Sequence, residues 1–341
     1  MGEPRMNLRV GAKPVLLFAI AWVAAVVFSA CSGSTSPTYE PIPPSEGRVM
    51  HHGLGETVVP KTPQRVILLG SVMDALALGV QPVGAGFSGI PQRANQGELV
   101  TMLRDRTDDI TIVGHTRSPN LEKIVQLAPD LILVSKDGKS LYPRLSQIAP
   151  TVFIDIARGA AAWQDYALES ATAMGKQAEA QAMLQLYQQR LEQFKQAMGD
   201  RLDTTVVSVA RFRPDHVRIY QQNSFSGAVL AEAGLLRPQR QQRNRPYETI
   251  NLESLSTVDG DVLFFMQDNP EKSILSKVQT HPLWSQLDVV QQDQIYEISL
   301  ETWFLNAGIV SAHMILNDLF RILVPNGDQY VINQVGELIL P

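Results

Sequence analysis

The sequence predicts an α/β protein built from two similar lobes that a long helix joins. Three observations lead to this fold class. Strand-like apolar runs alternate with helical segments along most of the chain, one helix–turn–strand segment occurs twice, and a long proline-free stretch lies between the two copies. Strands that alternate with helices are typical of βα units on largely parallel sheets.

The alternation is present in both halves of the chain. In the first half, strand-like runs begin near residues 65, 109 and 151, and a helical segment and Gly-rich turns follow the first of them. In the second half, runs begin near residues 204, 217 and 294. Each half therefore contains enough strands for a sheet of its own.

The repeated segment consists of Asn120–Val134 and Asn251–Phe265, which begin 131 residues apart (positions 120 and 251). Both copies open with Asn-Leu-Glu, continue with apolar residues at helical spacing, and end in a turn whose Asp precedes an apolar run. Asn caps helices, and Glu in the first turn favours the helix dipole. A spacing this large indicates two similar lobes rather than a solenoid. A chance match of two short helix–strand units is the alternative.

The stretch between the copies, residues 160–198, contains no proline and only Gly175 as a helix breaker. It is rich in good helix formers, and apolar residues recur every three or four positions from Leu184 to Met198. A coiled coil would use the same pattern, but the stretch is short for one. We therefore expect a long helix that joins the two lobes.

The amino terminus predicts export and a lipid anchor. Three basic residues precede the apolar run Val15–Phe28, and small residues then lead to Cys31, the only cysteine. This order is typical of a secretory signal peptide, and it resembles a bacterial lipobox, with Phe28 where Leu is usual. An uncleaved transmembrane anchor is the alternative, but 14 apolar residues fall short of the roughly 20 that span a bilayer.

Charge and cysteine content exclude several classes of protein. The formal net charge of the whole chain is −5. The leader contributes three bases and Glu3, a charge of +2, so the mature chain carries −7, which argues against nucleic-acid binding. A single cysteine forms no internal disulfide and makes thiol catalysis, zinc–thiolate sites and iron–sulfur clusters poor interpretations.

We expect five regions along the chain. They are a lipoprotein signal peptide with Cys31 (1–31), a flexible Ser/Thr/Pro-rich tether (32–57), an N-terminal lobe (58–159), the linker helix (160–199) and a C-terminal lobe (200–341).

An ordered set of segments resembles the substrate-binding lipoproteins of ABC importers, in the helical-backbone class that serves ferric siderophores and cobalamin. The resemblance runs from Val59 to Leu323 and includes VVPKTPQRVILLG, ALGVQPVG, PNLEKIVQLAPDLILVS, LSQIAPTVFID, HPLWSQLDVVQQDQIYEI and ILNDLF. It implies two Rossmann-like lobes, a ligand cleft between them, and no enzymatic activity. It also implies a monomer, held by its lipid at the outer face of the cell membrane or in the periplasm.

Two repeat-related carboxylates match the residues by which this family docks on its permease. Glu122 and Glu253 occupy the same position in the two copies, in the first helical turn. The resemblance implies that they contact an ABC permease dimer, which works with its ATPase. The alternative is that both carboxylates only favour the helix N-terminus.

The ligand site is expected to combine arginines with aromatic residues. Arginine donates bidentately to carboxylate and to metal-bound oxygen, which suits an anionic or oxygen-rich ferric siderophore. Arg211 and Arg213 follow a strand and lie on one side of it, opposite Phe212, at the carboxyl end where α/β sheets bind ligands. The candidate ligand-binding residues are Arg117, Tyr142, Arg211, Arg213, Tyr220, Asn223, Phe225, Arg245 and Trp303. Solvated charges and packed aromatics are the alternative for each of them.

No protein-bound cofactor is expected, because the siderophore would hold the iron itself. The six histidines are scattered, although His115, His216 and His313 together leave a zinc or other transition-metal site open. Cobalamin and haem are alternative ligands. An exported α/β hydrolase is a weaker alternative, because the chain has no Gly-x-Ser-x-Gly, His-Glu-x-x-His, P-loop or dinucleotide fingerprint.

Overall fold

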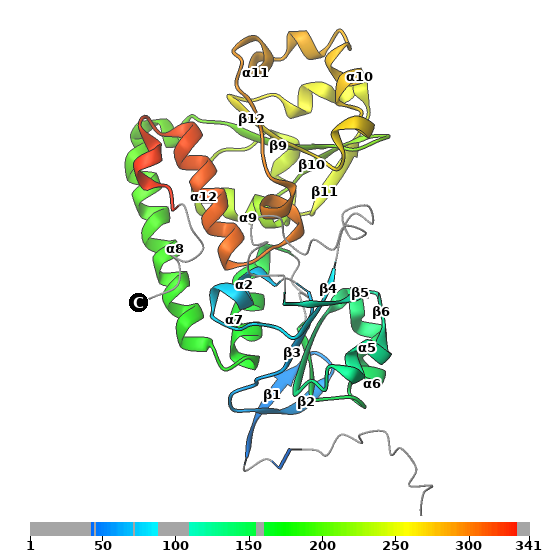
Figure 1. The fold of residues 1–341 in the computed structure, drawn as a ribbon. Helices are drawn as coiled ribbons and strands as arrows, with labels where there is room; N and C mark the ends of the chain where they lie inside the picture. Colours follow the sequence, from blue (N-terminus) through cyan, green and yellow to red (C-terminus); the bar gives the residue numbers. More distant parts are fainter. Residues whose placement is uncertain (1–41, 44–45, 71, 88–108, 155–159, 333–341) are drawn as a thin grey trace, which may run out of the picture. The chain divides into compact units, whose positions relative to one another are not determined.

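The computed structural model describes residues 42–43, 46–70, 72–87, 109–154 and 160–332. They form two lobes, each built on its own sheet, as the sequence predicts (Figure 1). The signal peptide, Cys31 and residues 32–41 and 44–45 of the tether lie outside the described residues. Within the described ranges, no helix is both long enough and apolar enough to cross a membrane.

The N-terminal lobe contains a six-stranded sheet in the order β6-β5-β4-β3-β7-β8. All neighbouring strands of this sheet pair in parallel except β6, which is antiparallel to β5. Parallel strands require crossovers, which here include short helices. The elements are β3 (Val66–Leu69), α2 (Met73–Ala77), β4 (Gly84–Phe87), β5 (Thr111–His115), β6 (Ser118–Pro119), α5 (Leu121–Gln126), β7 (Leu131–Ser135), α6 (Tyr142–Leu145) and β8 (Thr151–Ile154).

The C-terminal lobe contains a five-stranded sheet in the order β11-β10-β9-β12-β13. Here β9, β12 and β13 are parallel, whereas β10 and β11 turn back as antiparallel neighbours. The elements are β9 (Val207–Phe212), β10 (Val217–Tyr220), α9 (Phe225–Glu232), β11 (Tyr247–Ile250), η6 (Leu252–Val258), β12 (Val262–Gln267), α10 (Leu275–Gln279), α11 (Asp288–Gln291), β13 (Ile295–Glu297), η9 (Glu301–Leu305) and α12 (Ile309–Leu323).

The sequence repeat corresponds to a structural repeat. Its first copy forms α5 and β7, with Asn120 accepting a hydrogen bond from the N–H of Lys123 at 2.8 Å, and its second forms η6 and β12. Asp130 accepts the backbone N–H of Arg65 at 2.9 Å, directly before β3. Asp261 accepts the N–H of Val206 at 2.7 Å, directly before β9. The two aspartates thus fix the same strand pairing in both lobes, which excludes a chance match.

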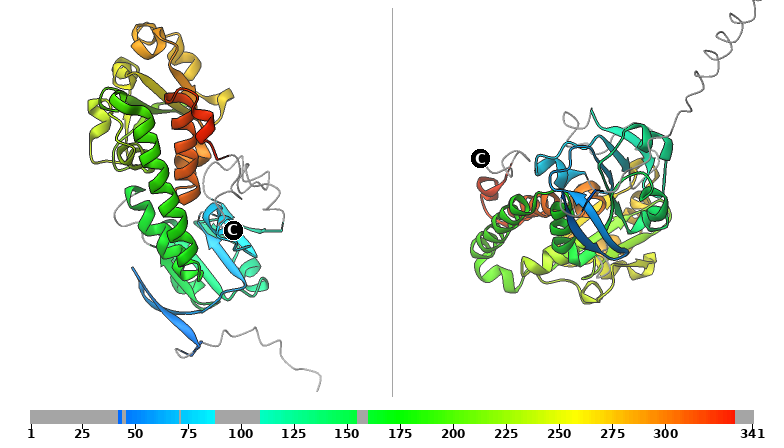
Figure 2. Two further views of the ribbon diagram at one scale, coloured as in Figure 1. Left: turned by 90° about the vertical axis from the view of Figure 1, so that its left-hand side faces the viewer. Right: turned by 90° about the horizontal axis from the view of Figure 1, so that it is seen from below.

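The predicted linker segment holds two helices rather than one. Gly175, with φ of 75°, separates α7 (Trp163–Ala173) from α8 (Gln177–Met198), because the left-handed backbone conformation ends the first helix. The 22-residue α8 is the long helix of the fold. It packs along α12, and the two helices run side by side in both views (Figures 1 and 2).

A buried polar cluster joins α8 to α12. Arg190 donates to Nδ1 of His313 at 3.1 Å and to Oδ1 of Asn317 at 2.6 Å. Nδ1 of His313 is therefore an acceptor, and its Nε2–H donates to the carbonyl of Met183 at 3.2 Å. Burial, followed by the Arg190 charge, lowers the pKa of His313 to about 3. His313 is thus a neutral packing residue.

The predicted tether ends earlier than expected. Residues 47–57 are not flexible, because β1 (Gly47–His52) pairs with β2 (Gly55–Pro60) as an antiparallel hairpin. Arg48 of β1 donates to the carbonyl of Thr172 at 2.6 Å, at the end of α7. Ser/Thr/Pro content does not report such a tertiary contact, so composition placed the boundary too late.

Candidate functional site

The predicted arginines of the C-terminal lobe meet a carboxylate at the carboxyl ends of two central strands. Arg211 and Arg213 lie at the end of β9, and Asp268 directly follows β12. Nε of Arg211 donates to Oδ1 of Asp268, and Nη1 of Arg213 forms an ion pair with Oδ2 at 3.1 Å. Phe212 points the other way and packs against Phe265 and Trp284. The predicted alternation is therefore confirmed, and Asp268 joins the two arginines.

Arg211 is held firmly from several sides. Its side chain is 4% exposed, its Nη1 donates to the hydroxyl of Tyr220 at 3.3 Å, and its guanidinium lies 4.5 Å from the centre of the Phe304 ring. Burial is the largest single influence on the pKa of Arg211 and lowers it, but the hydrogen bonds and charges of Asp268 and Tyr220 together outweigh burial, so the pKa lies above its ordinary value. Arg211 is a fixed charge with Tyr220 as its neighbour.

Arg213 is the more accessible of the two arginines. Its side chain is 27% exposed. Asp268 occupies its Nη1, whereas its Nε is buried and has no hydrogen-bond partner among the described residues. Nε and Nη2 form one edge of a guanidinium, and this edge matches a carboxylate bidentately. Arg213 therefore carries a buried donor that no described residue satisfies.

A second basic group lies along β10 and β11. Arg218 is the cross-strand partner of Arg211, and its guanidinium stacks 4.3 Å from the centre of the Tyr247 ring. Glu248 pairs with Arg240 and Arg243, which neutralises much of the nearby loop. The predicted Arg245 is exposed, and its hydrogen bonds among the described residues are made by its backbone.

Asn223 and Phe225 differ in what they offer a ligand. The N–H of Asn223 donates to the carbonyl of Arg245 at 3.1 Å, and its side chain is half-buried. Phe225 is only 3% exposed and meets Trp163 edge to face at 5.8 Å. Phe225 is therefore a core residue, and the expectation that it contacts ligand is corrected.

Trp303 also lies in the core rather than on a ligand-facing surface. It is 1% exposed, packs against Phe264 in a tilted arrangement with ring centres 5.0 Å apart, and its Nε1–H donates to Asp318 at 2.8 Å. The expectation that Trp303 contacts ligand is corrected, because η9 turns the indole inward.

In the N-terminal lobe, the two predicted ligand-binding residues, Arg117 and Tyr142, lie in different environments. Arg117 follows β5, is 67% exposed, and pairs with Asp137 at 3.1 Å. Tyr142 instead faces the β1–β2 hairpin, where its hydroxyl lies 3.4 Å from Nε2 of His52. Tyr142 is therefore corrected to a residue that packs the hairpin against the lobe.

The three histidines considered for a metal site do not meet. His115 lies in β5 of one lobe, His216 precedes β10 of the other, and His313 is locked in the core by Arg190. The described residues contain no cluster of three or more His, Cys, Asp or Glu side chains suited to a metal ion.

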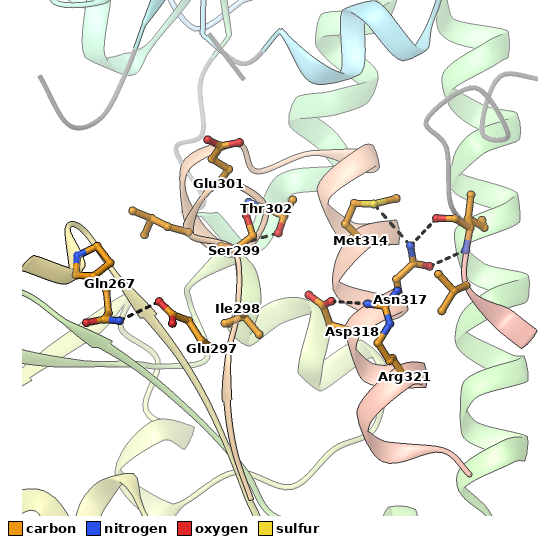
Figure 3. Close-up of a pocket in the computed structure, with 14 residues that line it drawn as sticks. Gln267, Glu297, Ile298, Ser299, Glu301, Thr302, Met314, Asn317, Asp318 and Arg321 are labelled. Atoms are coloured by element: carbon orange, nitrogen blue, oxygen red, sulfur yellow. Dashed lines mark hydrogen bonds and ion pairs between the residues drawn. The ribbon is translucent and has the colours of Figure 1, made fainter. Parts of the chain in front are cut away.

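A cavity of about 640 Å³ lies between the end of β13 and α12 (Figure 3). Gln267 and Pro270, which flank Asp268 in sequence, form part of its wall. Its charged lining residues are three acids, Glu297, Glu301 and Asp318, and one base, Arg321. An anionic ligand would be repelled here, so the arginine cluster suits such a ligand better.

The two repeat-related glutamates are on the surface. Glu122 in α5 and Glu253 in η6 are both exposed, and neither carboxylate has a partner among the described residues. A second cavity, of about 680 Å³, adjoins Glu253 and is also lined by Arg240 and Lys277. Both carboxylates are available for a partner protein.

Sequence reasoning missed Asp268, Asp137 and Phe304. Asp268 and Asp137 each follow a strand of the repeat, so their position after the apolar run was a usable signal. No sequence signal pointed to Phe304, because only the π-helical turn of η9 brings its ring onto Arg211.

Two lobes on separate parallel-cored sheets, bridged by long helices and bearing cations at strand carboxyl ends, define the class of two-lobed substrate-binding proteins. The model of the Periplasmic binding protein family matches residues 69–301, so the chain belongs to this family. The predicted family is thereby confirmed, and the protein is a substrate-binding protein rather than an enzyme.

Known proteins resemble this chain over most of its length. The probable siderophore-binding lipoprotein YfiY of Bacillus subtilis is 30% identical over 325 residues, which cover 90% of this chain and 97% of that protein. The Fe(3+)-citrate-binding protein YfmC of the same organism is 29% identical, covering 91% and 96%. The crystal structure of Staphylococcus aureus SirA complexed with staphyloferrin B has a TM-score of 0.71 and 29% identity, covering 81% and 98%.

Proposed function

We propose that this protein is a lipid-anchored substrate-binding protein that captures a ferric siderophore and delivers it to the permease of an ABC importer. The observation that carries the proposal is the arginine cluster at the carboxyl ends of β9 and β12. Its support comes from relatives named for siderophore or ferric citrate binding and from SirA, whose structure holds staphyloferrin B.

Ligand capture would use arginines from both lobes. Arg213 is partly exposed and its Nε–H has no hydrogen-bond partner among the described residues, and Arg117 is exposed at the end of β5. Both suit peripheral carboxylates or metal-bound oxygens of a ferric complex. The siderophore would hold the iron, and the protein would recognise the outer surface of the complex.

Delivery would use the two exposed glutamates. Glu122 and Glu253 occupy equivalent positions in the two lobes, which suits a permease dimer with two equivalent subunits. Two bridging helices, α8 and α12, resist wide hinge closure, so we expect small lobe movements on binding. The energy for transport would come from the ATPase partner.

The anchor is proposed on Cys31. A diacylglycerol on this thiol would hold the protein in the periplasm or at the outer face of the cell membrane. A Cys31→Ala variant would then lose palmitate labelling and leave the membrane fraction. Retention of the label would contradict the assignment.

The function is tested by calorimetric titration of the full-length protein in detergent micelles with ferric citrate, a ferric trihydroxamate, a ferric tris-catecholate, cobalamin and haem. We expect submicromolar binding of a ferric complex. Arg213→Ala should weaken binding at least tenfold, whereas Arg321→Ala, which removes a cation from the acidic cavity, should not. Weakening by Arg321→Ala alone would move the ligand to the cavity. Binding of cobalamin or haem alone would overturn the ligand class.

A further inference from the structure

The arginines of both lobes are held by carboxylates that occupy the same position in the repeat. Asp137 and Asp268 are 131 residues apart, which is the offset that also relates Asn120 to Asn251. Asp137 lies two residues beyond β7, and Asp268 lies one residue beyond β12. The repeat therefore extends past the strands and ends in an acidic residue at the ligand-binding edge of each sheet.

Each of these carboxylates pairs with an arginine proposed to contact ligand. Asp137 accepts from Nη2 of Arg117 at 3.1 Å, and Asp268 accepts from Arg211 and forms an ion pair with Nη1 of Arg213 at 3.1 Å. The arginines come from different strands in the two lobes, β5 and β9. The repeat thus preserves the carboxylate, while the arginines reach it from non-equivalent positions.

Protein stability explains only one of the two carboxylates. Asp268, 9% exposed, neutralises Arg211, which is 4% exposed, and a buried charge requires a partner. Asp137 is 35% exposed and Arg117 is 67% exposed, so this pair contributes little to stability. A negative charge beside Arg117 also weakens attraction for an anion. The presence of Asp137 therefore points to a role in ligand selection.

We propose that Asp137 and Asp268 are equivalent selectivity residues that limit the positive charge of the ligand site. This inference rests on the proposed function. Arg117, Arg211 and Arg213 with both aspartates carry a net charge of +1 instead of +3. The site then takes ferric complexes through a few exposed carboxylates, bound at the guanidinium edges that the aspartates leave open, and it does not bind polyanions indiscriminately.

The test compares an anionic and an uncharged ferric complex. Full-length wild type, Asp137→Asn, Asp268→Asn and the control Asp328→Asn, which removes an exposed carboxylate paired with Arg321, are titrated with ferric citrate and with a neutral ferric trihydroxamate at low and high salt. We expect ferric citrate affinity relative to the trihydroxamate to rise about threefold in Asp137→Asn and about tenfold in Asp268→Asn. The salt dependence for ferric citrate should steepen.

Asp137→Asn keeps the test decisive if loss of the buried Asp268 charge prevents folding. An unchanged preference in Asp137→Asn, or a change equal to that of Asp328→Asn, would overturn the inference and leave the proposed function standing. Equal weakening of both complexes in Asp268→Asn would show a purely structural role for that residue. Failure of the wild type to bind either complex would overturn the proposed carboxylate-bearing ligand class, and the inference with it.

Discussion

The carboxylate of Asp74 caps the first turn of α12 through the backbone N–H of Ile309, at 3.0 Å from Oδ2. Its other oxygen accepts the N–H of Val310, also at 3.0 Å. Asp74 belongs to α2 of the N-terminal lobe, so this contact ties that lobe to a helix that follows the C-terminal sheet. Gly308 is required beside it, because a Cβ there would lie 2.2 Å from Oδ2. The helix dipole favours the charge, whereas burial opposes it.

Asp74 should make stability depend on pH between about 4 and 6. Burial raises its pKa to about 6, although the two backbone hydrogen bonds lower it. The folded state therefore binds more protons than the unfolded state in this window, and the free energy of unfolding falls as pH rises, by about 3 kcal/mol. Urea unfolding of wild type and Asp74→Asn at several pH values should show a fall in stability that is larger in the wild type by about this amount. An Asp200→Asn control should retain it, and parallel curves for wild type and Asp74→Asn would contradict the prediction.

Arg190 should be required for stability. Arg190→Met retains much of the packing but leaves Nδ1 of His313 and the carbonyl of Tyr330 without this donor. Each orphaned buried acceptor costs about 1–3 kcal/mol, so we expect a loss of about 2–4 kcal/mol in chemical unfolding. Lys195→Ala, on the exposed face of the same helix, should cost under about 1 kcal/mol. A stability loss in Arg190→Met no larger than that of the control would show that the cluster contributes little.

Trp303 should affect stability and leave ligand affinity unchanged. Trp303→Phe removes the hydrogen bond to Asp318, a carboxylate whose pKa burial already raises. We expect a loss of about 1–3 kcal/mol in unfolding free energy and less than a twofold change in the affinity for a ferric siderophore. A tenfold loss of affinity at unchanged stability would restore Trp303 to the ligand site.

Glu122 and Glu253 should act in transport and not in binding. Replacing either by Lys reverses a charge on an exposed surface, so folding and ligand affinity should remain within about twofold of wild type. Uptake of radioactive ferric siderophore by cells should fall at least tenfold in the double variant, because like charges would face each other at the permease. Glu192→Lys, on α8, is the matched control. Normal uptake by the double variant would refute the docking role.

Local patterns predicted the larger part of the fold. The Asn120 and Asn251 segments placed one helix–strand unit in each lobe, because apolar spacing and turn residues act within about fifteen residues, although only Asn120 caps its helix with its side chain. The same patterns failed at the hairpin of β1 and β2. There the strands depend on contacts with α7, which lies more than a hundred residues away.

The candidate site was predicted less completely than the fold. Arg211 and Arg213 could be placed at the end of β9, because alternation along a strand fixes the side on which each residue lies. The sequence could not show whether Phe225 and Trp303 contact the ligand or pack in the core, because aromatic residues occur in both environments. Only packing against Trp163 and Phe264 decides between these positions.

The sequence by itself determined the two related lobes, the family and the cations at the carboxyl edge of the C-terminal sheet. Tertiary structure alone decided that Asp268 joins Arg211 to Arg213, that Asp74 caps α12, and that Tyr142 faces the hairpin. The physical reason is the distance along the chain over which each kind of interaction acts. Periodicity, capping and charge act between near neighbours in the chain, whereas ion pairs and burial depend on residues that the fold brings together across 57 to 235 positions.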